Sequence, residues 1–73
     1  MSKADEMFEE LGYEKQYEGT YKRGNQTIVF YFDSKEVAIY KKDENGIGID
    51  FIDMQELQAI NEKVKELKWN ENI

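Results

Sequence analysis

Residues 53–69, DMQELQAINEKVKELKW, carry the pattern around which this 73-residue chain can be organised. The apolar side chains in this stretch recur at steps of three, four and three residues, at Leu57, Ile60, Val64 and Leu67. This spacing places them on one stripe of an α-helix. Asp53, followed three residues later by Glu56, matches a capping box that starts the helix. A helix with one apolar stripe needs a surface to cover, and we expect the middle of the chain to supply it.

The N-terminal residues predict a second helix over residues 2–11. Ser2 and Asp5 form an S-x-x-D start signal. Apolar residues follow at helical spacing, at Ala4, Met7, Phe8 and Leu11. Gly12 then suits a left-handed C-terminal cap. The outer face of this helix is acidic and includes Glu6, Glu9 and Glu10; it is either an ordinary solvated face or a patch for a basic partner.

Between the two helices the apolar pattern changes to a period of two, which predicts β-strands. Turn signals lie at residues 24–25, 33–36 and 44–46. The predicted strands are residues 17–23, 26–32, 37–42 and 47–52. Short turns between consecutive strands are typical of an antiparallel meander. We therefore predict an α+β fold of order α-β-β-β-β-α, a four-stranded meander with the N-terminal and C-terminal helices on one face.

Turn length decides which side chains share a face of the sheet. A two-residue turn at Gly24-Asn25 sets Tyr21 opposite Ile28, and the next loop sets Phe32 opposite Val37. The last turn leaves two alignments open. A two-residue turn puts Ile39 on the same face as Gly48. A three-residue turn with a glycine bulge puts Ile39 opposite Phe51 instead, and we predict this second alignment because it unites the apolar residues of all four strands.

The predicted core is one face of this sheet together with the apolar stripes of both helices. The sheet contributes Tyr17, Tyr21, Ile28, Phe30, Phe32, Val37, Ile39, Ile47, Ile49 and Phe51. The helices contribute Met7, Phe8, Leu11, Leu57, Ile60, Val64 and Leu67. We expect Trp69 to fold back on the edge of the core and residues 70–73 to fray.

Composition limits the classes of function. The chain has no cysteine and no histidine, which excludes disulfides, thiolate zinc sites and imidazole chemistry. Its net charge of −6 disfavours binding to nucleic acid and to anionic lipid. No apolar run is long enough for a membrane span or a signal peptide. We expect one cytoplasmic domain over residues 1–73, without a cofactor.

No pattern of residues predicts catalysis. A nucleophile needs an adjacent base, and Ser2 and Ser34 lie at a helix start and in a turn. A catalytic carboxylate pair needs two acids in environments that separate their pKa values, and the sequence singles out no such pair among its sixteen acidic residues. Residues 43–50 have the look of a calcium loop, but Ile47 and Met54 occupy positions where an EF-hand requires ligands. We therefore predict that the chain is not an enzyme and has no catalytic residue and no metal site.

The second face of the predicted sheet is a candidate interaction surface. Its centre is apolar and aromatic, with Val29, Tyr31, Ala38, Tyr40 and Ile52. Such a patch often marks a binding site, although the same residues also stabilise a sheet through cross-strand contacts. Aromatic residues on an open sheet are also typical of single-stranded nucleic-acid platforms. The predicted partner-binding residues are Val29, Tyr31, Tyr40, Ile52, Glu6, Glu9 and Glu10.

Two stretches, MFEELGYEK at residues 7–15 and MQELQAINEKVKEL at residues 54–67, resemble short acidic proteins encoded in prophages and integrative elements of Gram-positive bacteria. The matching positions are mostly helix caps and core residues. The resemblance implies a bacterial accessory protein of mobile-element origin and carries no catalytic residue. Our hypothesis is a non-enzymatic protein-interaction module, with a homodimerising protein and a nucleic-acid platform as the alternatives.

Overall fold

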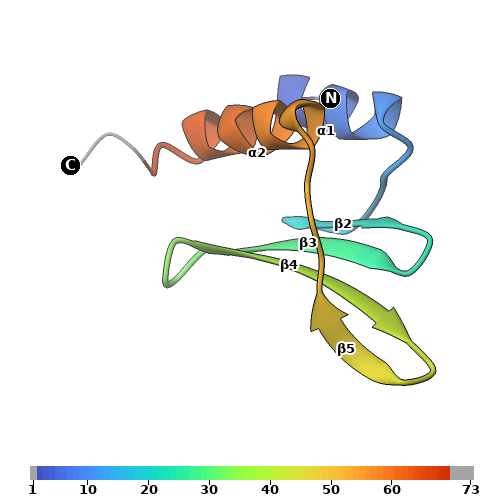
Figure 1. The fold of residues 1–73 in the computed structure, drawn as a ribbon. Coiled ribbons are helices and arrows are strands. Elements are labelled where there is room, and N and C mark those ends of the chain that lie inside the picture. Colours follow the sequence, from blue (N-terminus) through green and yellow to red (C-terminus); the bar gives the residue numbers. More distant parts are fainter. Residues whose placement is uncertain (1, 70–73) are drawn as a thin grey trace.

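The computed structural model describes residues 2–69, in which two helices lie on one side of an antiparallel sheet (Figure 1). The helices are α1 (Lys3–Glu10) and α2 (Met54–Glu66). The strands are β1 (Glu14–Tyr17), β2 (Thr20–Arg23), β3 (Gln26–Tyr31), β4 (Glu36–Asp43) and β5 (Gly46–Ile49). They pair in chain order as a five-stranded meander. The predicted α+β class is confirmed, but the sheet has five strands where we predicted four.

The additional strand exists because the predicted first strand, residues 17–23, turns back on itself. Gly19 has a φ angle of +84°, in the left-handed region that glycine adopts readily. The chain therefore reverses between β1 and β2, and Tyr17 pairs with Thr20. The prediction that Tyr17 lies in the core, opposite Phe32, is wrong, because its side chain is 76% exposed.

The central pairings keep the predicted faces. The Gly24-Asn25 turn aligns β2 with β3 as expected. Between β3 and β4 the pairing is shifted by two residues, so that Phe30, not Phe32, lies opposite Val37. A shift of two residues preserves the face, and both Val37 and Ile39 pack against the core.

The predicted three-residue turn before β5 is wrong. Asp43 pairs with Gly46, and Tyr40 pairs with Ile49, so two residues form the turn. The Asp43 carboxylate accepts the backbone N–H of Asn45 at 2.8 Å, which stabilises this tight turn. Because the pairing differs by one residue from our prediction, every side chain of β5 lies on the opposite face from the one expected.

The consequence is that most of the apolar residues around β5 are exposed. Ile47, Ile49 and Phe51, all predicted in the core, are 70%, 90% and 84% exposed. The β4–β5 hairpin extends away from the helices (Figure 1), so burial beneath a helix does not constrain its register. Ile52, predicted on the exposed face, instead follows β5 in the connection to α2 and packs against the core.

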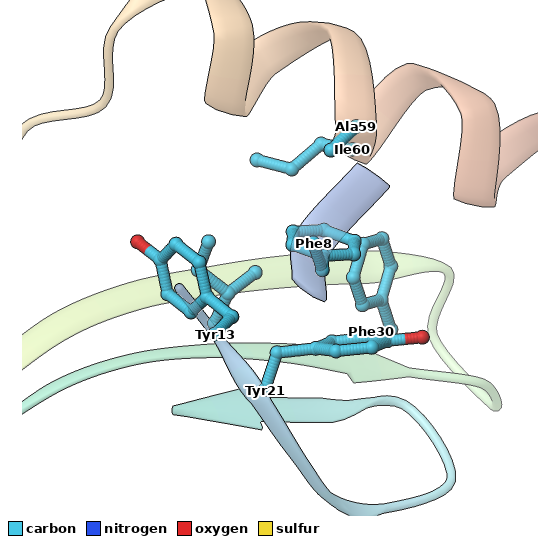
Figure 2. Close-up of a cluster of buried hydrophobic side chains, with 7 residues drawn as sticks. Phe8, Tyr13, Tyr21, Phe30, Ala59 and Ile60 are labelled. Carbon is cyan, nitrogen blue, oxygen red and sulfur yellow. The ribbon is translucent and has the colours of Figure 1, made fainter. Parts of the chain in front are cut away.

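The core lies between the helices and the β2–β3 part of the sheet. Its buried apolar residues are Ala4, Phe8, Tyr13, Tyr21, Ile28, Phe30, Ala59 and Ile60. Figure 2 shows Phe8 beneath Ala59 and Ile60 of α2 and above the ring of Tyr21. The Phe8 ring stacks on Tyr21 at 4.1 Å between centroids, and it meets Phe30 edge to face at 6.2 Å. Such ring pairs add stability beyond the area they bury.

Two predicted core residues lie at its margin. Phe32 is 43% exposed, because it is in the loop between β3 and β4. Leu57, in the first turns of α2, is 36% exposed. The predicted Trp69 contact is confirmed, since its ring lies 6.0 Å from that of Phe30. Residues 70–73, predicted to fray, lie outside the described residues.

Each helix ends in a backbone motif that positions an aromatic residue. After α1, Gly12 has a φ of +91° and Tyr13 donates its backbone N–H to Phe8 O at 2.9 Å. After α2, Lys68 has a φ of +60° and Trp69 donates to Val64 O at 3.2 Å. These are the bonds of a Schellman motif. The chain is thereby turned so that both aromatic rings pack against the core.

Candidate functional site

The candidate site lies on the face of the sheet that is turned away from both helices, which we call the open face (Figure 1). The strand pairings place two rows of side chains across its centre. One row is Thr20, Val29 and Ala38, and the other is Lys22, Thr27, Tyr40 and Ile49. Neither α1 nor α2 covers these rows, so the sheet itself forms this surface.

A hollow of about 360 Å³ lies on the open face, around the β2–β3 turn. Two tyrosines, two lysines and two threonines contribute to its lining: Tyr17, Tyr40, Lys22, Lys42, Thr20 and Thr27. Within residues 2–69, none of the residues that line this hollow carries a carboxylate. The hollow therefore offers aromatic surface, hydroxyl groups and positive charge, although the chain as a whole is acidic.

The structure brings together only some of the predicted site residues. Val29 and Tyr40 are half-buried on the open face, and Tyr31 is 49% exposed there. Ile52 is not part of this surface, because it packs against the core. The acidic residues Glu6, Glu9 and Glu10 are exposed on α1, on the opposite side of the sheet. The predicted residues thus form two separate surfaces.

The sequence reasoning missed three exposed apolar residues of the open face. Tyr17 faces solvent because of the reversal at Gly19, and Ile47 and Ile49 do so because of the two-residue turn. The two-residue turn was one of the alternatives that the sequence left open. Choosing the alignment that buries most apolar residues was the error, because the helices do not reach β5.

A buried carboxylate, Glu56, joins the helices to the sheet. It is only 3% exposed, and its Oε1 completes the predicted capping box by accepting the backbone N–H of Asp53 at 2.9 Å. Its Oε2 accepts the hydroxyl proton of Tyr13 and a guanidinium N–H of Arg23, the latter at 3.2 Å. Gln26 donates to the same oxygen at 3.5 Å. The carboxylate therefore connects the start of α2 to the end of α1 and to the β2–β3 hairpin.

The partners of Glu56 are themselves held in place. Arg23 donates to the Leu11 carbonyl at 2.8 Å, and its guanidinium lies 4.5 Å from the centre of the Tyr13 ring. Burial, and then the hydrogen bond to Glu56, raise the pKa of Tyr13, so its hydroxyl stays a donor. Among the described residues, no buried side-chain polar atom lacks a hydrogen-bond partner. A fully satisfied network of this kind stabilises the fold.

A second polar cluster lies under the other end of the helices. Asp5 accepts the Tyr21 hydroxyl proton and an ammonium proton of Lys15, while Glu18 accepts from Lys15 and from the buried Lys63. Burial alone would raise the pKa of Asp5, but the hydrogen bonds from Tyr21 and Lys15 outweigh it and lower that pKa. Hydrogen bonds from Lys63 and Lys15 lower the pKa of Glu18. These ion pairs connect α1 to β1 and α2 to the turn that follows β1.

Among the described residues, neither cluster has the geometry of a metal site. In the part of the chain that the structure describes, no three acidic residues lie close enough to hold a metal ion. The same part of the chain contains no helix that is both long and apolar enough to cross a membrane.

No family model, no curated protein and no solved structure matches the chain. The resemblance to mobile-element proteins therefore stays a prediction.

Proposed function

We propose that this chain is a non-enzymatic protein-interaction module of a bacterial mobile element, acting in the cytoplasm, and that it binds its partner through the open face. The observation that supports this is the exposed apolar surface of the open face, which neither helix covers. Tyr17, Tyr31 and Ile49 are 76%, 49% and 90% exposed. The solvated face of an antiparallel sheet is ordinarily polar, and exposed apolar and aromatic residues are typical of interaction surfaces.

The charges suggest which partner groups each surface would accept. Lys22 and Lys42 line the hollow, whereas the outer face of α1 carries Glu6, Glu9 and Glu10. The open face would accept a partner segment with an apolar or aromatic side chain followed by a carboxylate. The α1 face would accept a basic segment. Because the two surfaces lie on opposite sides of the sheet, the proposal assigns the main contact to the open face alone.

Affinity capture from a host lysate followed by NMR tests this proposal. A captured protein should shift the backbone resonances of Val29, Tyr31 and Tyr40 of the ¹⁵N-labelled chain. A Tyr31→Ala/Tyr40→Ala variant should lose the partner, and a Glu9→Gln/Glu10→Gln variant on α1 should retain it. Capture that the tyrosine variant retains, with resonance shifts confined to α1 and α2, would contradict the proposal.

A single-stranded nucleic-acid platform is the second candidate function, and the lining of the hollow favours it. Tyr17 and Tyr40 could stack on bases while Lys22 and Lys42 contact phosphates. The net charge of −6 opposes this binding at long range. Titration with short oligonucleotides at low salt separates the two functions. Binding that weakens with salt and is lost in a Tyr40→Ala variant would support the platform; absence of binding at low salt would remove it.

A further inference from the structure

The two edges of the sheet differ in how well they are protected against pairing with another strand. The β1 edge carries Glu14 and Lys15, and its pairing with β2 is irregular between Lys15 and Tyr17. Charged side chains and irregular pairing of this kind make an edge strand less able to pair with another strand. The β5 edge, Gly46–Ile49, has the sequence GIGI, with no charged residue, and pairs with β4 without a bulge. It is the unprotected edge of this sheet.

The backbone of β5 presents its hydrogen-bonding groups in a regular pattern. Lys42 donates its backbone N–H toward β3, to Asn25 O at 2.9 Å. In an antiparallel ladder the bonded positions alternate, so the bonded pairs between β4 and β5 are Lys41 with Gly48 and Asp43 with Gly46. The backbone N–H and C=O groups of Ile47 and Ile49 are therefore directed outward, to the unpaired side. Within the described residues, no strand pairs with this side of β5.

We propose that β5 is a self-association edge, along which two copies of this chain pair antiparallel about a two-fold axis at Gly48. In this register Ile47 of one copy lies opposite Ile49 of the second copy, so all the outward backbone groups of both isoleucines are bonded. Nothing lies within 4 Å of the position of a Gly48 Cβ, so no other part of the described chain covers the strand at this position. The arrangement makes one continuous sheet with both open faces on the same side.

A second copy fits this edge because the strand is complementary to itself. A two-fold interface requires the same patch on both molecules, and a Gly-Ile-Gly-Ile strand satisfies this without placing a charged side chain of β5 in the contact. Ile47 and Ile49, 70% and 90% exposed in the single chain, would cover each other across the axis. The inference goes beyond the proposed function, because a monomer could bind a partner through the open face equally well.

The expected association is weak and strengthens with salt. A short edge contact falls below the size of a standard interface, about 1,200–2,000 Å². Each copy has a net charge of −6, so the two copies repel each other until salt screens the charge. Association driven by the acidic face of α1 would have the opposite salt dependence, because salt weakens attraction between opposite charges.

Sedimentation velocity of the full chain tests the proposal, from about 10 μM to about 1 mM protein and in about 50 mM and about 500 mM NaCl. We expect the mass to rise toward a dimer with concentration, and more so at high salt. Ile49→Ser should weaken dimerisation by about tenfold or more. Tyr17→Ser, which also replaces an exposed apolar residue by an uncharged polar one but at the β1 edge, should not. Both side chains are exposed, so circular dichroism should show that both variants fold.

Two further measurements address the backbone pairing itself. Ile49→Pro removes one outward N–H and should abolish the dimer without unfolding an edge strand. Hydrogen exchange at the Ile47 and Ile49 amides should slow with protein concentration, while exchange at Gly48, which is already bonded to β4, should not change. A monomer at the highest concentration in high salt would overturn the proposal. So would a dimer that persists in Ile49→Pro, a dimer that weakens with salt, or β5 amides protected only by a different captured protein.

Discussion

Removing the Glu56 carboxylate should be among the most costly single changes in this chain. In Glu56→Ala, the buried Tyr13 hydroxyl and the Arg23 guanidinium lose their shared acceptor, and the capping box loses one of its two bonds. Breaking a buried, hydrogen-bonded charge pair costs about 3–5 kcal/mol. We place the cost near 3 kcal/mol, because the Arg23 side chain is 39% exposed and regains water.

That loss is large against the stability of a 73-residue domain, which is about 4–11 kcal/mol. Urea unfolding, followed by the fluorescence of the single tryptophan, measures it, because Trp69 packs beside Phe30. Glu62→Ala is the matched control on the same helix. Its 3.9 Å ion pair is with Lys65, whose side chain is 67% exposed, so breaking this pair should cost less than about 0.5 kcal/mol.

A double-mutant cycle tests whether Glu56 acts through the network. Tyr13→Phe removes one donor to Glu56 and should cost about 1–2 kcal/mol. When it is combined with Glu56→Ala, the two losses should fall short of additivity by about 1 kcal/mol, because both remove the same bond. A Glu56→Ala cost below about 1 kcal/mol, or strictly additive losses in the cycle, would refute the assignment of Glu56 as the residue that joins helices and sheet.

Four further substitutions, one of them a control, test the backbone and the second polar cluster. Gly19→Ala should lower the free energy of unfolding by about 2 kcal/mol or more, since the φ of Gly19 is +84° and an added Cβ would lie 2.7 Å from the Phe32 ring. Gly24→Ala is the control: Gly24 has a φ of +62° but open space around it, so this change should cost only about 1 kcal/mol. Lys68→Gly should raise the melting temperature, because Lys68 holds a φ of +60° that glycine adopts with less strain. The lowered pKa of Asp5 predicts that its contribution is full above its unfolded pKa of about 4 and is lost as the pH falls through the lower folded value. Asp5→Asn should therefore flatten the acid limb of the stability–pH curve, and an unchanged limb would contradict this.

The parts of the fold that sequence predicts well are those set by local signals. The apolar spacing and the caps at Ser2 and Asp53 predict both helices, and both caps form as expected. The bounds of α1 agree within one residue, whereas α2 ends three residues before the predicted end at Trp69. The Gly24-Asn25 turn fixes the β2–β3 alignment, because its length leaves no alternative that pairs both flanking strands. At these positions the neighbouring residues in the sequence are sufficient to determine the local structure.

The parts that sequence misses depend on where distant elements lie. Alternation continues through Gly19, so nothing in the local pattern distinguishes a continuous strand from a reversal there. The β5 register was predicted by assuming that apolar residues are buried, and this fails because the helices cover β2 and β3 but leave Ile47 and Ile49 uncovered. Glu56 was recognised as a capping residue, but not as a network centre, because Tyr13 and Arg23 are more than thirty residues away.

The pairing of β5 with β4 decides which residues make up the open face and its edge, and NMR can observe it directly. In the two-residue turn, Tyr40–Ile49 and Lys42–Ile47 are the non-bonded pairs, whose Cα atoms approach to about 4.5 Å. We predict strong Hα–Hα contacts for these two pairs. Strong Hα–Hα contacts of Tyr40 with Asp50 and of Lys42 with Gly48 instead would indicate the three-residue turn, in which the isoleucines of β5 lie on the helix side of the sheet. That result would contradict both the open face and the self-association edge.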